Sequence, residues 1–239
     1  MRAIFVGIEY AGKTTLIEAL DEYYHHFKIQ SHLDDHFTIP DSTLSRSSRA
    51  KAVDFPDDVK ERMQRMQIHY HIDVIKKFDP VLVAGWHIEE AVYTAMYGQD
   101  PQSPYYQGYR YDFQRMYEAK LLALDLPGLI LVHLTASDQT IWQRIRDQPH
   151  EYQIVREADI AELKRRFCEE IDKSLFPPAK TIVLDTTDKM PQQSLDELLA
   201  RSEPMISQAE LAIRAMPVPD GDYEVVYEKG VRKMIAPSQ

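Results

Sequence analysis

A glycine-rich segment near the start of the chain has the residue types that bind phosphate. It reads Gly7-Ile8-Glu9-Tyr10-Ala11-Gly12-Lys13-Thr14, and Thr15 follows. The two glycines allow a tight turn whose successive N–H groups can point at one anion. Lys13 can reach the β- and γ-phosphate oxygens of a nucleotide, and the Thr14 hydroxyl can ligate Mg²⁺. The segment therefore predicts a nucleotide-binding phosphate loop, or P-loop.

The residues on either side of this loop supply the context that it needs. Arg2–Val6 is a short apolar run that predicts a buried strand, and Lys13–Tyr24 has helical spacing. A helix that begins at Lys13 adds its positive N-terminal end to the phosphate site. A GTPase is disfavoured, because Asp125-Leu126-Pro127-Gly128 precedes a predicted strand and the chain has no asparagine for an Asn-Lys-x-Asp motif. A phosphoryl-transferring kinase is the favoured class.

The rest of the chain alternates short apolar runs with helical periodicity. The predicted strands are Arg2–Val6, Phe27–Leu33, Pro80–Ala84, Leu129–Leu134 and Thr181–Leu184. The predicted helices are Lys13–Tyr24, Pro56–Phe78, Glu89–Tyr97, Tyr111–Leu124, Gln139–Asp147, Asp159–Leu175 and Pro191–Ala215, the last with a break at Pro204, while Asp34–Phe55 is a loop or a short helix. This order predicts an α/β P-loop NTPase fold with a five-stranded parallel sheet flanked by helices.

The end of the chain has a different pattern. A Pro-rich breaker follows Met216, and then Tyr223–Tyr227 and Val231–Ile235 flank a Glu-Lys-Gly turn. This pattern predicts a hairpin. We therefore expect a kinase domain over residues 1–215 and a short C-terminal extension over residues 216–239.

Composition limits the partners and the compartment. The formal net charge of −10 argues against a large nucleic-acid surface, although a local basic patch is not excluded. One cysteine, Cys168, fits a reducing compartment, and no apolar run is long enough to span a membrane. We expect a cytoplasmic protein without membrane association.

Three blocks resemble the thymidylate kinase-like group of nucleoside and nucleotide kinases, over roughly residues 1–200. They are Phe5–Leu16 with its doubled threonine, Leu126–Ser137 followed by Ile141–Arg146, and Lys180–Thr187. The resemblance implies ATP as phosphoryl donor, Mg²⁺ as cofactor and a nucleotide or nucleoside as acceptor. It leaves a homodimer open.

The second block implies a lid at about residues 144–158. In the resembling family, arginines of the lid close over the phosphates, which points to Arg144 and Arg146 as catalytic residues. Arg156, just beyond, is a candidate nucleotide-binding residue. Residues 148–158 lack apolar periodicity, which predicts a loop between two helices.

Candidate acceptor residues follow the predicted strands, because the carboxyl ends of parallel strands line the ligand crevice. Asp35 follows the second strand, and the resemblance to deoxynucleoside kinases implies that it takes the proton of an acceptor hydroxyl. His87, Glu89 and Tyr93 follow the third strand. Arg65, on the long helix after Pro56, is a candidate clamp for an acceptor phosphate. A tyrosine-rich segment could stack a base or pack in the core, and it holds Tyr105, Tyr106, Tyr109, Tyr111 and Phe113.

One departure from the resembling family leaves the acceptor open. Ala84-Gly85-Trp86-His87 stands where the family carries an Asp-Arg pair. An acidic, arginine-poor crevice would favour a hydroxyl acceptor over a monophosphate. The alternatives are a kinase that acts on a modified base or hydroxyl in a nucleic acid or other metabolite, and a nucleotide-binding protein without catalysis.

Overall fold

The computed structural model describes residues 1–35, 45–98, 113–216, 224–228 and 231–235. Its strands are β1 (Arg2–Val6), β2 (His32–Asp35), β3 (Val81–Ala84), β4 (Leu129–Thr135), β5 (Thr181–Asp185), β6 (Glu224–Glu228) and β7 (Val231–Ile235). Its α-helices are α1 (Lys13–His26), α2 (Arg46–Val53), α3 (Asp57–Lys77), α4 (His87–Tyr97), α5 (Phe113–Leu122), α6 (Asp138–Asp147), α7 (Ile160–Asp172), α8 (Pro191–Ser202) and α9 (Gln208–Arg214).

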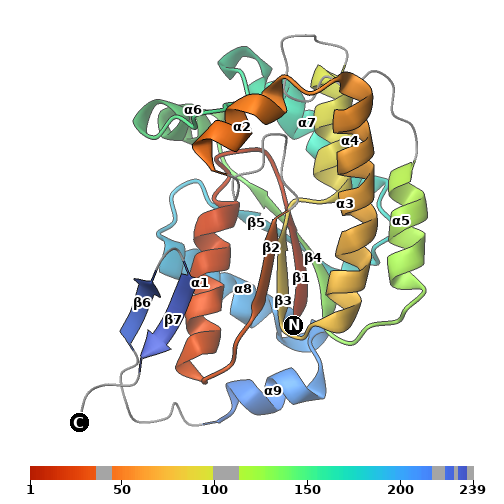
Figure 1. The fold of residues 1–239 in the computed structure, drawn as a ribbon. Coiled ribbons are helices and arrows are strands. Elements are labelled where there is room, and N and C mark those ends of the chain that lie inside the picture. Colours follow the sequence, from red (N-terminus) through yellow and green to blue (C-terminus); the bar gives the residue numbers. More distant parts are fainter. Residues whose placement is uncertain (36–44, 99–112, 217–223, 229–230, 236–239) are drawn as a thin grey trace.

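Strands β1 to β5 form a parallel sheet in the order β2-β3-β1-β4-β5 (Figure 1). β1 lies at its centre, where Phe5 pairs with Ala84 of β3 and with Val132 of β4. Ile4, Phe5 and Val6 are fully buried, as expected for a strand covered on both faces. The predicted α/β fold with a five-stranded parallel sheet is confirmed.

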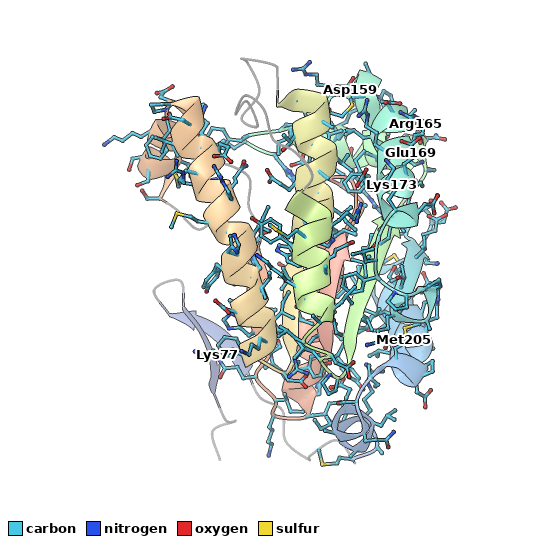
Figure 2. All side chains as sticks on the ribbon, turned by 90° about the vertical axis from the view of Figure 1, so that its right-hand side faces the viewer. Lys77, Asp159, Arg165, Glu169, Lys173 and Met205 are labelled. Atoms are coloured by element: carbon cyan, nitrogen blue, oxygen red, sulfur yellow. The ribbon has the colours of Figure 1, made fainter. Side chains whose placement is uncertain are left out.

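Helices cover both faces of this sheet. α1 and α8 pack together on one face, and α3, α4, α5 and α7 cover the other (Figure 1). Helix α7 is amphipathic, which explains its place against the sheet. Ile160, Leu163 and Phe167 are buried on its inner side, whereas Arg165 and Glu169 lie along its outer side (Figure 2). The two layers bring the carboxyl ends of all five strands to one edge of the sheet. None of the helices in the described ranges is both long and apolar enough to cross a membrane.

The second strand lies later in the chain than the sequence predicted. α1 continues to His26, and Phe27 packs its ring against Tyr23 at a centroid distance of 5.2 Å. The alternation of apolar and polar residues from Phe27, which predicted a strand, therefore arises partly because Phe27 packs against the last turns of α1. As a result, Asp35 is the last residue of β2 and does not follow it. β2 is an edge strand, a position that tolerates charged residues.

Two other features agree with the sequence, each for a local reason. The polar stretch before α3 contains helix α2, whose first turn is capped by the Ser45 hydroxyl accepting from the Ser48 N–H. The last predicted helix is broken at Pro204, which lies in a 3₁₀ turn between α8 and α9.

The C-terminal strands β6 and β7 pair antiparallel, so the predicted hairpin is found. The division into residues 1–215 and 216–239 stays a proposal. The tyrosines of the segment 105–111 lie outside the described residues, as does the side chain of Phe113.

The turn from β1 into the P-loop is held against β4. Gly7 has φ +150°, and a Cβ at this position would lie 2.2 Å from the Leu134 carbonyl oxygen. Gly12 also has a left-handed φ, +91°, but a Cβ there would meet nothing closer than 3.8 Å. The first glycine is required by close approach of two backbones, and the second only by conformation.

This difference gives a stability prediction. We expect Gly12→Ala to cost about 1–3 kcal/mol of unfolding free energy through backbone strain alone. Gly7→Ala adds a backbone clash and is expected to cost more than about 3 kcal/mol. Urea denaturation of the two variants, side by side, measures the order. Equal destabilisation would contradict the packing argument for Gly7.

Candidate active site

A cavity of about 790 Å³ opens at the carboxyl edge of the sheet. Its walls come from the P-loop, the end of β2, helices α2 and α4, the segment after α6 and the loop after β5. The lining residues include Glu9, Tyr10, Gly12, Lys13, Thr14, Thr15, Asp35, Arg49, Glu89, Tyr93, Arg144, Asp147, Gln148, His150, Glu151, Tyr152, Ile154, Thr186 and Lys189.

The P-loop has the shape that the sequence predicted. Tyr10 and Gly12 both adopt left-handed backbone angles, and α1 begins at Lys13. No side chain caps the first turn of α1, so its leading N–H groups are available to an anion. The Lys13 ammonium folds back over the loop, where it donates to the Gly7 carbonyl at 2.6 Å and lies 3.3 Å from that of Ile8.

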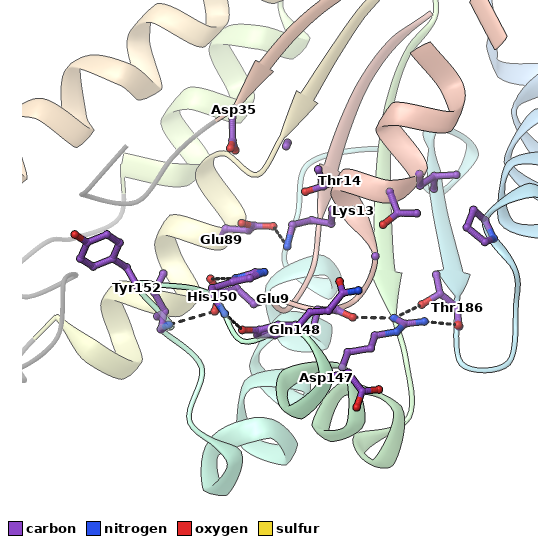
Figure 3. Close-up of a pocket in the computed structure, with 18 of the residues that line it drawn as sticks. Glu9, Lys13, Thr14, Asp35, Glu89, Asp147, Gln148, His150, Tyr152 and Thr186 are labelled. Carbon is purple, nitrogen blue, oxygen red and sulfur yellow. Dashed lines mark hydrogen bonds and ion pairs between the residues drawn. The ribbon is translucent and has the colours of Figure 1, made fainter. Parts of the chain in front are cut away.

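The Glu89 carboxyl lies directly beside the Lys13 ammonium in the cavity (Figure 3). Its Oε1 lies 3.1 Å from the Lys13 Nζ and accepts the Gly7 N–H at 3.1 Å. Burial raises the pKa of the Glu89 carboxyl to about 7, although the Lys13 ammonium acts in the opposite direction. Asp35 also raises this pKa through like-charge repulsion. Glu89 is therefore a carboxyl poised to exchange a proton near neutral pH.

Two more predicted residues lie in the same cavity. Asp35 points into it from the end of β2, on the side where Thr14 lies (Figure 3). Tyr93, one turn after Glu89 on α4, accepts the Glu9 N–H at 2.8 Å. The cavity thus combines the P-loop, a hydroxyl suited to Mg²⁺ and, among its carboxyl groups, the two predicted ones of Asp35 and Glu89.

Arg144 links the end of α6 to the P-loop. Its guanidinium donates to the Tyr10 carbonyl at 2.7 Å and to the Thr186 carbonyl at 2.9 Å. The Thr186 hydroxyl in turn lies 2.9 Å from the Ala11 carbonyl oxygen. Burial lowers the pKa of Arg144, while Asp185 raises it. Arg144 therefore reaches the cavity, as the sequence predicted.

Residues 148–156 form a non-helical segment, as the sequence predicted for a loop, and we call it the lid segment after the predicted lid. Its residues Gln148, His150, Glu151, Tyr152 and Ile154 line the cavity. Its N–H groups at Ile154 and Val155 donate to Glu9 Oε2 at 3.3 and 3.2 Å. His150 stacks on Tyr10 with ring centroids 4.3 Å apart. Ile154 and Val155 are buried, so the far end of the segment is anchored in the core.

The sequence missed a cation on the opposite wall. Arg49 of α2 lines the cavity, and its guanidinium lies 3.2 Å from a carboxylate oxygen of Glu151 in the lid segment. The expectation of an arginine-poor crevice is therefore wrong. No local signal marked Arg49, because it lies in a polar stretch without apolar periodicity.

His87 and Arg65 do not line the cavity. α4 begins at His87, two residues earlier than predicted, and the imidazole turns into the core. There its Nε2 lies 2.6 Å from Glu118 Oε1 of α5, and both side chains are fully buried. Burial lowers the pKa of His87, against the effect of Glu118. Arg65 forms an ion pair with Glu61 one turn before it on α3.

Arg146 and Arg156 also lie outside the cavity lining. The Arg146 guanidinium packs over the Trp142 ring at 4.0 Å, one turn earlier on α6. Because Arg144 and Arg146 are two residues apart on a helix, their side chains point to different faces. Arg156 lies over the Tyr97 ring of α4 at 5.4 Å. Of the three predicted lid arginines, only Arg144 lines the cavity.

Sequence reasoning also missed several residues that complete the site. They are Arg49, Gln148, His150, Glu151, Tyr152, Thr186 and Lys189. Thr186 carried a usable signal, since it directly follows a predicted strand whose carboxyl end faces the crevice. The lid-segment residues carried none beyond their place in a predicted loop.

Taken together, the central β1–loop–α1 unit and the sheet order define a P-loop protein. The chain has the P-loop fold of thymidylate and deoxynucleoside kinases, as its structural neighbours establish. No protein-family model matches the sequence, and no curated protein does.

Three solved structures illustrate the likeness. YorR from Bacillus subtilis, in complex with phosphorylated GDP, has 14% identity and a TM-score of 0.54, over 91% of this chain and 100% of that one. Thymidylate kinase from Candida albicans has 16% identity and a TM-score of 0.53, over 83% and 88%. Deoxyadenosine kinase from M. mycoides, with dCMP and dCDP bound, has 12% identity and a TM-score of 0.52, over 84% and 97%.

The raised pKa of Glu89 gives a pH prediction. A carboxyl whose folded pKa is about 7 and whose ordinary value is 4.5 binds its proton more tightly in the folded state. Its contribution to stability is therefore complete below pH 4.5 and declines as the pH rises toward 7. We expect wild type to lose up to about 3 kcal/mol over this interval relative to Glu89→Gln.

Urea denaturation at a series of pH values measures this difference. Glu18→Gln, at an exposed position of α1, is the matched control and should leave the pH dependence unchanged. A constant gap between wild type and Glu89→Gln from pH 4.5 to 7 would contradict the assignment.

Proposed function

We propose that the protein is an ATP-dependent phosphotransferase that transfers the γ-phosphoryl group to a nucleoside or nucleotide. The observation that carries the proposal is the presence of both halves of such a reaction in one cavity. Lys13 and the P-loop would form its donor side, and the carboxyl groups of Asp35, the last residue of β2, and of Glu89, in the first turn of α4, line the same cavity. Phosphoryl transfer depends mainly on positioning and charge neutralisation, which these groups can supply.

On the donor side, the uncapped first turn of α1 and the Lys13 ammonium would hold the phosphates. Lys13 would exchange its present carbonyl partners in the loop for phosphate oxygens, which accept stronger, charge-assisted hydrogen bonds. Thr14 would hold Mg²⁺, which neutralises phosphate charge when it is bound with the nucleotide. The Arg144 guanidinium would add positive charge at the rim.

On the acceptor side, Asp35 would take the proton of the attacking hydroxyl. Asp35 lies at the end of β2 and lines the cavity. Glu89 would shift from Lys13 when phosphates take its place, and its carboxyl would then be available to orient the acceptor. The similar deoxyadenosine kinase supports a hydroxyl acceptor.

Arg49 supports a second acceptor class, a nucleoside monophosphate. Its guanidinium lines the cavity and already contacts a carboxylate, that of Glu151. An acceptor phosphate could replace this carboxylate with similar geometry. The similar thymidylate kinase supports this reading. Arg49, and not Arg65, is thus the side chain with which to test a phosphate clamp.

The first prediction under this proposal concerns the donor. We expect Lys13→Ala to lower turnover of ATP by about 10²-fold or more, because one preorganised charge on the transferring group is lost. Lys76→Ala, at an exposed position of α3, is the control and should retain wild-type turnover. The measurement is labelled-ATP turnover with a panel of nucleosides, monophosphates and short oligonucleotides. Wild-type turnover in Lys13→Ala would overturn the proposal.

The same panel separates the alternatives. Transfer only to oligonucleotides would indicate a kinase that acts on nucleic acid. Tight ATP binding without transfer to any acceptor would indicate a nucleotide-binding protein without catalysis.

The second prediction concerns the acceptor. With a nucleoside, we expect Asp35→Asn to lower turnover by about 10²-fold or more, the usual contribution of a positioned base. Arg49→Ala should then change it little. Steady-state kinetics of both variants with a nucleoside and with its monophosphate decide between the two classes. A large loss for Arg49→Ala on the monophosphate, with Asp35→Asn near wild type, would contradict the hydroxyl acceptor.

A further inference from the structure

Two P-loop residues at positions without an assigned phosphate-binding role, Glu9 and Tyr10, contact the lid segment. In the motif, glycine, lysine and threonine have assigned roles, whereas the positions of Glu9 and Tyr10 are variable. Glu9 Oε2 accepts the N–H groups of both Ile154 and Val155, and Glu9 Oε1 lies 3.6 Å from His150 Nδ1. The Glu9 side chain thus points away from the loop interior (Figure 3).

Tyr10 provides a second, independent contact. Its ring stacks on His150, and its hydroxyl accepts the His150 N–H at 2.9 Å. Tyr10 has φ +66°, a left-handed angle that is unfavourable for a bulky side chain. Such strain persists only where surrounding contacts over-determine the conformation. A loop shaped for phosphate alone would be served better by glycine at this position.

The lid segment is also held by helix α2. Glu151 lies between Arg46 and Arg49 of α2, with oxygen–nitrogen distances of 3.0 and 3.2 Å. Arg49 also lies over the Tyr152 ring at 5.8 Å. The segment therefore bridges the P-loop, on the donor side, and α2, on the acceptor side.

We propose that Glu9 and Tyr10 are positioning residues that dock the lid segment onto the P-loop, so that phosphate binding in the loop and closure of the lid are coupled. The Glu9 N–H is itself fixed by the Tyr93 hydroxyl, so the docking point is set by α4. Movement of the loop around a phosphate therefore moves the acceptor of the Ile154 and Val155 N–H groups. The docking contact stands on geometry alone, whereas its coupling to nucleotide rests on the proposed function.

Amide hydrogen exchange resolved at Ile154 and Val155 tests the docking. These two N–H groups have Glu9 Oε2 as their acceptor, and removal of a charged acceptor is expected to speed their exchange about tenfold or more. We expect this effect in Glu9→Ala, with exchange in the central strands unchanged. Glu9→Gln keeps an oxygen acceptor without the charge and should give an intermediate rate. Glu18→Ala, at an exposed position of α1, is the matched control.

The same experiment with the Mg²⁺ complex of a non-hydrolysable ATP analogue tests the coupling. In wild type, the analogue should slow exchange at Ile154 and Val155, and in Glu9→Ala it should leave their exchange unchanged. Tyr10→Phe, which keeps the stacking and loses the hydroxyl, should speed exchange at His150 only.

The possible outcomes separate the docking contact, its coupling to the nucleotide and the proposed function. Exchange at Ile154 and Val155 that is equal in wild type and Glu9→Ala overturns the docking role. A Glu9 effect on exchange, together with no response of the wild type to the analogue, keeps the docking contact and overturns the coupling. Failure of the proposed function is seen separately, as absence of phosphoryl transfer by the wild type while the Glu9 effect on exchange remains.

Discussion

The site depends on the close approach of the P-loop to the backbone of β4. At Gly7 there is no room for a Cβ in front of the Leu134 carbonyl, so the loop leaves the sheet at its centre and in one direction only. That direction sets where α1 begins and where the Lys13 ammonium lies. It also brings the Gly7 N–H to Glu89, which couples the loop to α4. The sheet order, with β3 and β4 on either side of β1, supplies both neighbours.

Charge balance is the second organising feature of the cavity. Lys13 and Glu89 form an ion pair at a buried place where either charge alone would be costly. Burial raises the pKa of the Glu89 carboxyl to about 7. Arg144 and Arg49 add two more positive charges to the lining of the cavity, and Arg49 is paired with Glu151.

The lid segment joins these features into one unit. Its two anchors are chemically different: hydrogen bonds to Glu9 and aromatic stacking on Tyr10 at one side, and ion pairs with α2 at the other. Both P-loop anchors come from variable positions of the motif. The side chains of the P-loop thus contact a second segment that lines the same cavity.

The sequence by itself determined the local parts of this protein. The P-loop was predictable because its glycines, lysine and threonine lie within eight consecutive residues, and strands β1, β3, β4 and β5 because they are short and mostly apolar. The polar edge strand β2 was misplaced, because its sequence lacks that signal. Asp35, Glu89, Tyr93 and Arg144 were placed in the crevice because strand order and helix order bring them to one edge.

Only the tertiary structure decided which other side chains turn toward that edge. His87 lies in the core beside Glu118, because α4 begins two residues earlier than predicted. Arg146 packs on Trp142, because it lies on a different helix face from Arg144. Arg49 reached the cavity because α2 packs beside the lid segment, a contact between residues about a hundred positions apart that no local pattern encodes.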